Sequence, residues 1–189
     1  TRLPPDLNTA GTIKAGKLLD INAAAVGGDG QLLSLGDINL VSGQGINNSG
    51  EMIANGNFNF TTPGDVINSG KLLAGSKLDL HANNLFNDAS GEINAGQDWL
   101  TVNGTLTNYG LIDGKHTLLN ANTLTNIGTG RIYGDAIGVQ TVTFNNLAEN
   151  GTAATLAGRE RVEIGPQTPK NYDHRRLYRR GGGTVRARG

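Results

Sequence analysis

The chain contains no cysteine, which excludes structural disulfides, thiolate metal sites and thiol catalysis. It has no apolar run of the roughly 18 residues that a membrane-spanning helix needs. Aromatic residues make up 5% and apolar residues 37% of the sequence, which is little for a thick globular core. The N-terminus lacks the basic and apolar stretches of a signal peptide and does not begin with methionine, so we expect an interior piece of a longer protein.

The formal net charge of zero conceals an uneven distribution. Residues 166–189 carry +6, and residues 1–165 therefore carry −6. An acidic body is a poor match for phosphate backbones, so we expect no nucleic-acid partner for it. The 29 glycines would suit a disordered chain, but regularly placed aliphatic residues argue against disorder in residues 7–165.

A unit of about twenty residues recurs eight times between residues 7 and 165. A glycine follows an I/L-x-A segment in each copy: Gly16, Gly36, Gly56, Gly75, Gly96, Gly114, Gly134 and Gly158. In the first seven copies another glycine precedes that segment, and an aliphatic residue stands two positions after it: Ile13, Leu32, Met52, Leu72, Ile93, Ile112 and Ile132. So short a period, without helical spacing, predicts a solenoid.

Each unit contains short stretches in which apolar and polar residues alternate, such as Phe58-Asn59-Phe60 and Leu78-Asp79-Leu80. This alternation indicates strands with one buried face. We therefore predict an all-β, right-handed parallel β-helix of about eight coils. Residues 1–165 would form the repeat region, and residues 166–189 a basic, Gly/Arg-rich and poorly ordered tail. An antiparallel sandwich also uses short strands with Gly/Asn turns, but it needs no constant period.

Stacked coils bring equivalent residues into columns along the rod axis. Ile13, Leu72 and Ile132 are expected in one inner row. Equivalent asparagines of five successive coils are expected to form a hydrogen-bonded ladder: Asn48, Asn68, Asn87, Asn108 and Asn126. The turn glycines Gly16 to Gly134 are expected to adopt positive φ. An outward column is predicted to hold Asp20, Asn39, Asn59, Asp79, Thr101, Gly138 and Glu163.

Segments such as Asn68-Ser69-Gly70-Lys71-Leu72-Leu73-Ala74-Gly75 and residues 106–114 resemble filamentous haemagglutinin repeats. The stretch 157–165 also resembles a phrase that recurs in these proteins. The family forms the shafts of exoproteins that Gram-negative bacteria release by two-partner secretion, including adhesins and contact-dependent growth inhibition effectors. The resemblance covers residues 7–165, and the family's secretion and toxin domains lie outside it.

The resemblance implies a non-catalytic shaft segment that is secreted or displayed at the cell surface and presents an adhesive or toxic tip. Its implied partners are an outer-membrane two-partner secretion transporter, flanking repeats of the same chain and a receptor on the target cell. An alternative is that the flank of the rod itself binds glycans or proteins. A β-helical polysaccharide-active enzyme is a further alternative.

Few residues suit a chemical site. Asp79 with His81 is the nearest approach to a catalytic pair, but Leu100-Thr101-Val102 rather than Asp98 is expected to align with them, so we predict no catalytic residues. His116 and His174 lack partners at metal-ligand spacing, and we predict no metal and no cofactor. Trp99 could stack on a sugar, although packing is the simpler interpretation. In the tail, Arg175, Arg176, Arg179 and Arg180 are candidate contacts for an anionic partner, the alternative being a frayed end.

Overall fold

The computed structural model describes residues 2–167, and every regular element in this range is a strand. The strands are β1 (Leu7–Asn8), β2 (Thr12–Ala15), β3 (Leu18–Ala23), β4 (Val26–Gly28), β5 (Gln31–Ser34), β6 (Asp37–Ser42), β7 (Gly45–Asn48), β8 (Glu51–Ala54), β9 (Phe58–Thr61), β10 (Asp65–Asn68), β11 (Lys71–Ala82), β12 (Leu85–Asn87), β13 (Glu92–Asn108), β14 (Leu111–Ile127), β15 (Arg131–Glu149), β16 (Thr152–Ala153) and β17 (Thr155–Gly165). No helix of these residues is long and apolar enough to cross a membrane.

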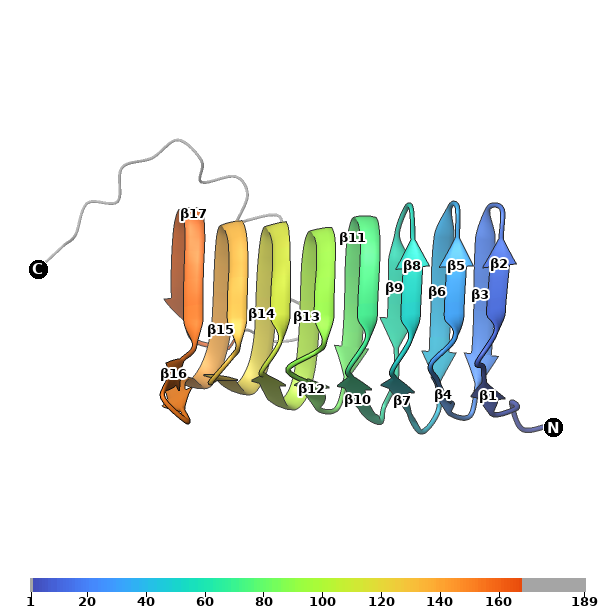
Figure 1. Cartoon of the computed structure of the whole chain (residues 1–189), viewed down its shortest axis with the longest axis horizontal. Coiled ribbons are helices and arrows are strands. Elements are labelled where there is room, and N and C mark those ends of the chain that lie inside the picture. Colours follow the sequence, from blue (N-terminus) through green and yellow to red (C-terminus); the bar gives the residue numbers. More distant parts are fainter. Residues whose placement is uncertain (1, 168–189) are drawn as a thin grey trace, which may run out of the picture.

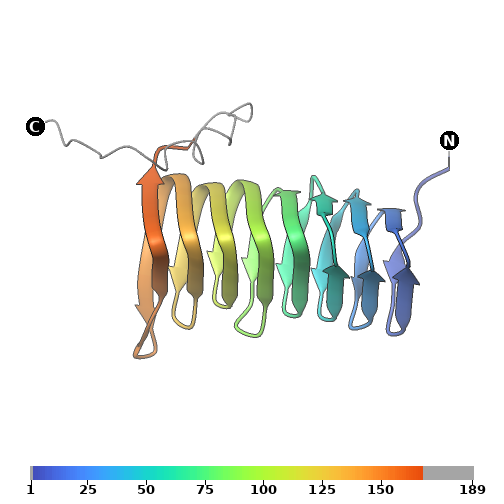
Figure 2. The same cartoon turned by 90° about the horizontal axis from the view of Figure 1, so that it is seen from above.

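The strands stack in parallel as a right-handed β-helix of about eight turns, which confirms the predicted fold class. Figures 1 and 2 show the turns side by side along one axis, with the chain advancing steadily from β1 to β17. We number the turns as rungs 1 to 8, comprising residues 7–23, 26–42, 45–61, 65–82, 85–102, 105–121, 123–141 and 143–165. Each rung has a first, a second and a third strand segment, and from rung 4 onward these segments merge into longer strands such as β13.

The interior consists of aliphatic and aromatic rows that run along the axis. The strand register places Ile13 next to Leu32, and the row continues through Met52, Leu72, Ile93, Ile112, Ile132 and Leu156. The expected inner row is therefore confirmed. Phe58 and Phe60 are fully buried in two further rows, with their ring centroids 5.6 Å apart. Each rung thus buries its apolar side chains against the rungs above and below it.

The register of rung 5 differs from the expectation. Leu78 pairs with Asp98, Asp79 with Trp99 and Leu80 with Leu100, so Asp98-Trp99-Leu100 is the counterpart of Leu78-Asp79-Leu80 in this rung. Between Ala95 and Gln97 the corner has one residue fewer than its counterpart between Ala74 and Lys77. The predicted alignment of Leu100-Thr101-Val102 was therefore wrong by two residues. Trp99 takes the place assigned to Thr101 in the outward column, and Asp98 turns toward the core.

The explanation for the turn glycines was also wrong. Positive φ occurs at Gly28, Gly45, Gly128 and Gly151, and at none of the seven turn glycines from Gly16 to Gly134. Four of these seven, Gly36, Gly75, Gly96 and Gly114, are instead glycines because a Cβ would lie within 3 Å of a backbone carbonyl oxygen of the preceding rung. A Cβ at Gly96 would lie 2.7 Å from the carbonyl oxygen of Ser76. Gly16 has open space around it.

A β-hairpin interrupts rung 8. β15 pairs antiparallel with β16, and Asn150 (φ 51°) and Gly151 (φ 77°) form the turn between them. Two consecutive positive φ values are typical of the tight hairpin turns that Asn-Gly favours. The hairpin accommodates the additional residues between Gly134 and Gly158, after which β17 resumes the parallel stack on β15. The insertion therefore leaves the row of Ile132 and Leu156 intact.

Candidate functional site

Buried asparagines form a continuous ladder along the rod. Asn48 donates from Nδ2 to Oδ1 of Asn68 at 2.9 Å, and the same contact repeats from Asn68 to Asn87 (2.9 Å), Asn87 to Asn108 (2.9 Å) and Asn108 to Asn126 (3.0 Å). The ladder continues from Asn126 to Asn146 at 2.9 Å, and Asn146 was not among the expected members. The motif Phe144-Asn145-Asn146 carries the same spacing and could have identified it.

The ladder also secures the neighbouring turn. Asn48, Asn108 and Asn126 donate to the backbone oxygens of Lys71 (3.0 Å), Gly110 (3.0 Å) and Thr155 (2.9 Å), respectively. Amide side chains with both a donor and an acceptor can satisfy one another in a buried column. The ladder therefore fixes the axial register of the rungs without exposing its polar atoms.

Replacing Asn87 by alanine should destabilise the protein by about 3 kcal/mol, because Asn68 and Asn108 would each lose a buried hydrogen-bond partner. For a chain of this size this corresponds to a fall in Tm of about 6–12 °C. Asn47→Ala is the matched control, since Asn47 is exposed on the outer side of β7. Thermal unfolding followed by circular dichroism measures both. Equal Tm values for the two variants would contradict a stabilising role for the ladder.

The outer face of rungs 4 and 5 holds the cluster of Lys77, Asp79, His81 and Trp99. Asp79 accepts from Nε2 of His81 at 3.0 Å and lies 3.6 Å from Nζ of Lys77. The same ammonium group lies 3.6 Å from the ring centroid of Trp99, within the range of a cation–π interaction. Partial burial alone would raise the pKa of Asp79, but the hydrogen bond and charge of His81 and the charge of Lys77 together lower it. Asp79 is thus a stable anion in a mixed-charge surface.

This cluster lacks the features of a hydrolytic centre. Asp79 and Asp98 are on adjacent rungs, but Asp98 is directed into the core and Asp79 outward. A pair of carboxylates facing one substrate, which glycoside hydrolysis requires, is therefore not assembled from them. Within residues 2–167, no group of three or more His, Asp or Glu side chains could hold a metal ion.

Asp98 is the most unusual residue of the interior. It is 0% exposed, occupies an inner row between Leu78 and Thr117, and neither carboxyl oxygen has a hydrogen-bond partner. A Cβ at Gly114 would lie 2.8 Å from its Oδ2, so the missing side chain at Gly114 leaves room for the carboxyl group. Burial, and secondly the charge of Asp113, raise the pKa of Asp98 well above its ordinary value. The carboxyl group is therefore stabilised in its neutral form.

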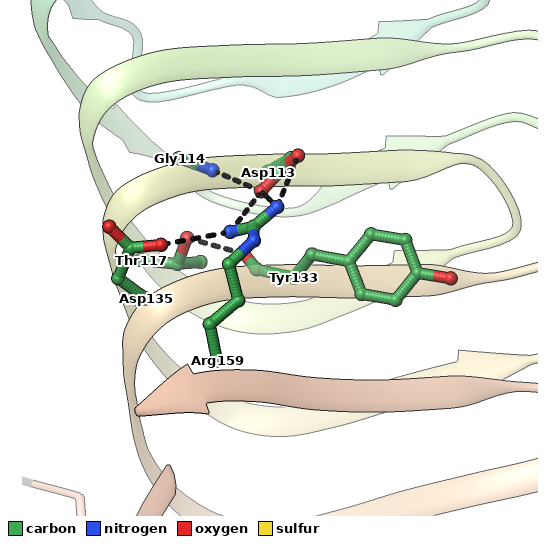
Figure 3. A network of polar contacts seen from close by, with 6 residues as sticks. All are labelled: Asp113, Gly114, Thr117, Tyr133, Asp135 and Arg159. Atoms are coloured by element: carbon green, nitrogen blue, oxygen red, sulfur yellow. Dashed lines mark hydrogen bonds and ion pairs between the residues drawn. The ribbon is translucent and has the colours of Figure 1, made fainter. Parts of the chain in front are cut away.

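An exposed ion-pair network joins rungs 6, 7 and 8 at the corner between the second and third strand segments. Arg159 of rung 8 lies 3.3 Å from Oδ1 of Asp135 in rung 7 and 3.3 Å from Oδ1 of Asp113 in rung 6 (Figure 3). Asp113 also accepts from the backbone N–H of Gly114 at 2.8 Å, and the hydroxyl of Thr117 donates to the carbonyl oxygen of Tyr133 at 2.8 Å. Because Arg159 is exposed, we regard the network as a surface clamp of small energetic effect.

The remaining candidates lie elsewhere. The tail arginines Arg175, Arg176, Arg179 and Arg180, and with them His174, fall outside the described residues.

No family model, curated protein or solved structure matches the chain.

Proposed function

We propose that the chain is a structural shaft segment of a secreted, cell-surface exoprotein, and that it holds an adhesive or toxic tip away from the cell. In this proposal a two-partner secretion transporter exports the full-length protein, flanking repeats extend the rod, and the tip meets a receptor on the target cell. The repeats that resemble filamentous haemagglutinin are the basis for the family assignment.

The observation that carries the proposal is the continuity of the inner rows over the described rungs and of the asparagine ladder from rung 3 to rung 8. Each rung contacts only its neighbours, so the length of such a rod is set by the number of rungs. A stack held by regular backbone hydrogen bonds and a buried polar ladder makes a stiff spacer. The described part of the chain thus has the properties that a shaft requires.

A shaft should tolerate the removal of one complete rung. Deleting residues 50–69 joins Ser49 to Gly70, which recreates the natural Asn-Ser-Gly junction and places Asn48 beneath Asn87. The rod should shorten by about 4.8 Å, the spacing of neighbouring strands, and keep its cross-section. Small-angle X-ray scattering measures both dimensions. Deletion of residues 50–59 is the matched control, because it removes the second strand segment of rung 3 with Met52 of the inner row, so that the rung cannot close and folding should be lost.

The functional part of the test uses the full-length exoprotein at the cell surface. Removing residues 50–69 should leave the adhesion or growth inhibition produced by the tip unchanged. Loss of that activity in a protein that is still exported and folded would contradict the shaft proposal.

A further inference from the structure

A second surface feature goes beyond a spacer role. The corner between the second and third strand segments, at the upper edge of the rungs in Figure 1, carries an open groove of about 440 Å³. Its lining comes from four successive rungs: Asn57 of rung 3, Ser76 and Lys77 of rung 4, Gly96 and Gln97 of rung 5, and Lys115 and His116 of rung 6. The groove therefore extends along the rod axis, across the direction of the strands.

The register explains how these residues meet. Lys77 pairs with Gln97, and Gln97 with His116, so three long polar side chains stand above one another at the start of the third segment. Gly96 lies between the corner residues Ser76 and Lys115 and contributes no side chain. The groove is thus lined by polar side chains from rungs 3 to 6, with a glycine among them at rung 5.

The lining carries two lysines and can donate hydrogen bonds. It contains no aspartate or glutamate, although Lys77 lies 3.6 Å from Asp79 outside the lining, so Lys115 contributes most of its positive charge. The amides of Asn57 and Gln97 and the hydroxyl of Ser76 add neutral polar groups, which can pair with hydroxyl groups. At the edge of the groove Lys77 lies 3.6 Å from the ring centroid of Trp99, so the aromatic ring adjoins the cationic lining.

We propose that this groove binds an anionic saccharide chain that lies along the rod. The lysines would pair with its carboxylate or sulfate groups, the amides and the hydroxyl with its hydroxyl groups, and the ring of Trp99 with the apolar face of a sugar unit. The extended shape of the groove fits a linear chain. Two lysines are few for the charge density of a nucleic acid, whose binding depends on many phosphate contacts. This proposal does not depend on the shaft role.

The chain contains a single tryptophan, so fluorescence excited selectively at tryptophan reports on Trp99 at the edge of the groove. Titration of the full chain with polygalacturonate oligomers should change Trp99 fluorescence in a saturable, salt-sensitive manner, because Lys77 would move from the ring toward the ligand. Dextran sulfate in place of polygalacturonate distinguishes sulfate from carboxylate recognition. Neutral dextran should give no change.

Lys115→Gln should weaken the binding by about tenfold, which corresponds to the loss of one charge-assisted hydrogen bond. Lys71→Gln is the matched control, because it removes the same charge from an exposed site outside the groove lining. Both sites are exposed, and circular dichroism checks that both variants are folded. The proposal is overturned if neither anionic probe changes the fluorescence, if neutral dextran acts equally, or if the two variants bind alike.

Discussion

Replacing Ile93 by arginine should abolish the folded stack in its central part. Ile93 is 0% exposed and lies in the inner row between Leu72 and Ile112. The substitution removes a buried aliphatic side chain, costing about 2–5 kcal/mol, and adds an unpaired charge that the interior cannot solvate. Together these costs reach the total stability of an ordinary domain, about 5–15 kcal/mol. Circular dichroism should show a loss of the cooperative thermal transition.

Asn94→Arg is the control for this experiment. Asn94 is the next residue of β13 and points to the outer side, where an arginine can reach solvent. It should unfold within a few degrees of the unsubstituted protein. A cooperative transition of Ile93→Arg at the temperature of this control would contradict the inner row.

Replacing Asp98 by valine should stabilise the protein by about 2 kcal/mol at neutral pH, because it substitutes an apolar side chain for a buried carboxyl group without hydrogen-bond partners. In its row Asp98 lies between Leu78 and Thr117, and Ile137 follows Thr117, so the β-branched side chain of valine suits its surroundings. Guanidinium unfolding measures the difference in free energy. A less stable valine variant would mean that the carboxyl group contributes favourably to the interior.

The pH dependence of this effect has a defined sign. Folding raises the pKa of Asp98 above its ordinary value of 3.8, so the folded protein retains a proton that the unfolded chain loses. The contribution of Asp98 to stability is therefore fully present below about pH 3.8 and declines as the pH rises toward the folded pKa. In that interval the decline is about 1.4 kcal/mol per pH unit.

Asp98→Asn is the test of this dependence, because it keeps the size of the side chain and removes its titration. Stability measured from acid to neutral pH should fall more steeply in the unsubstituted protein than in this variant. Asp79, whose pKa is lowered, titrates in both proteins and so cancels in the comparison. Parallel stability profiles would show that Asp98 keeps its ordinary pKa.

The surface cluster of Lys77, Asp79, His81 and Trp99 could be predicted from the sequence only in part. Asp79 and His81 were noted as a pair and Trp99 as a separate candidate, and the structure places Trp99 beside Asp79 on adjacent strands. The cation–π contact of Lys77 and the groove with Lys115 were not predicted. Both depend on which residues of neighbouring rungs lie side by side at a corner, and corner lengths vary by a residue from rung to rung.

The sequence by itself determined the solenoid, its number of turns, the inner row through Ile13, Leu72 and Ile132, and the membership of the asparagine column from Asn48 to Asn126. It could do so because rungs contact only their neighbours, so that a regular period in the chain becomes a regular contact in space. The tertiary structure alone decided the register of rung 5. The segments Asp98-Trp99-Leu100 and Leu100-Thr101-Val102 differ by two residues, so both place their first and third residues on the inner side. Only the closure of the turn against rungs 4 and 6 selects between them. That closure places Asp98 in the core and Trp99 on the surface.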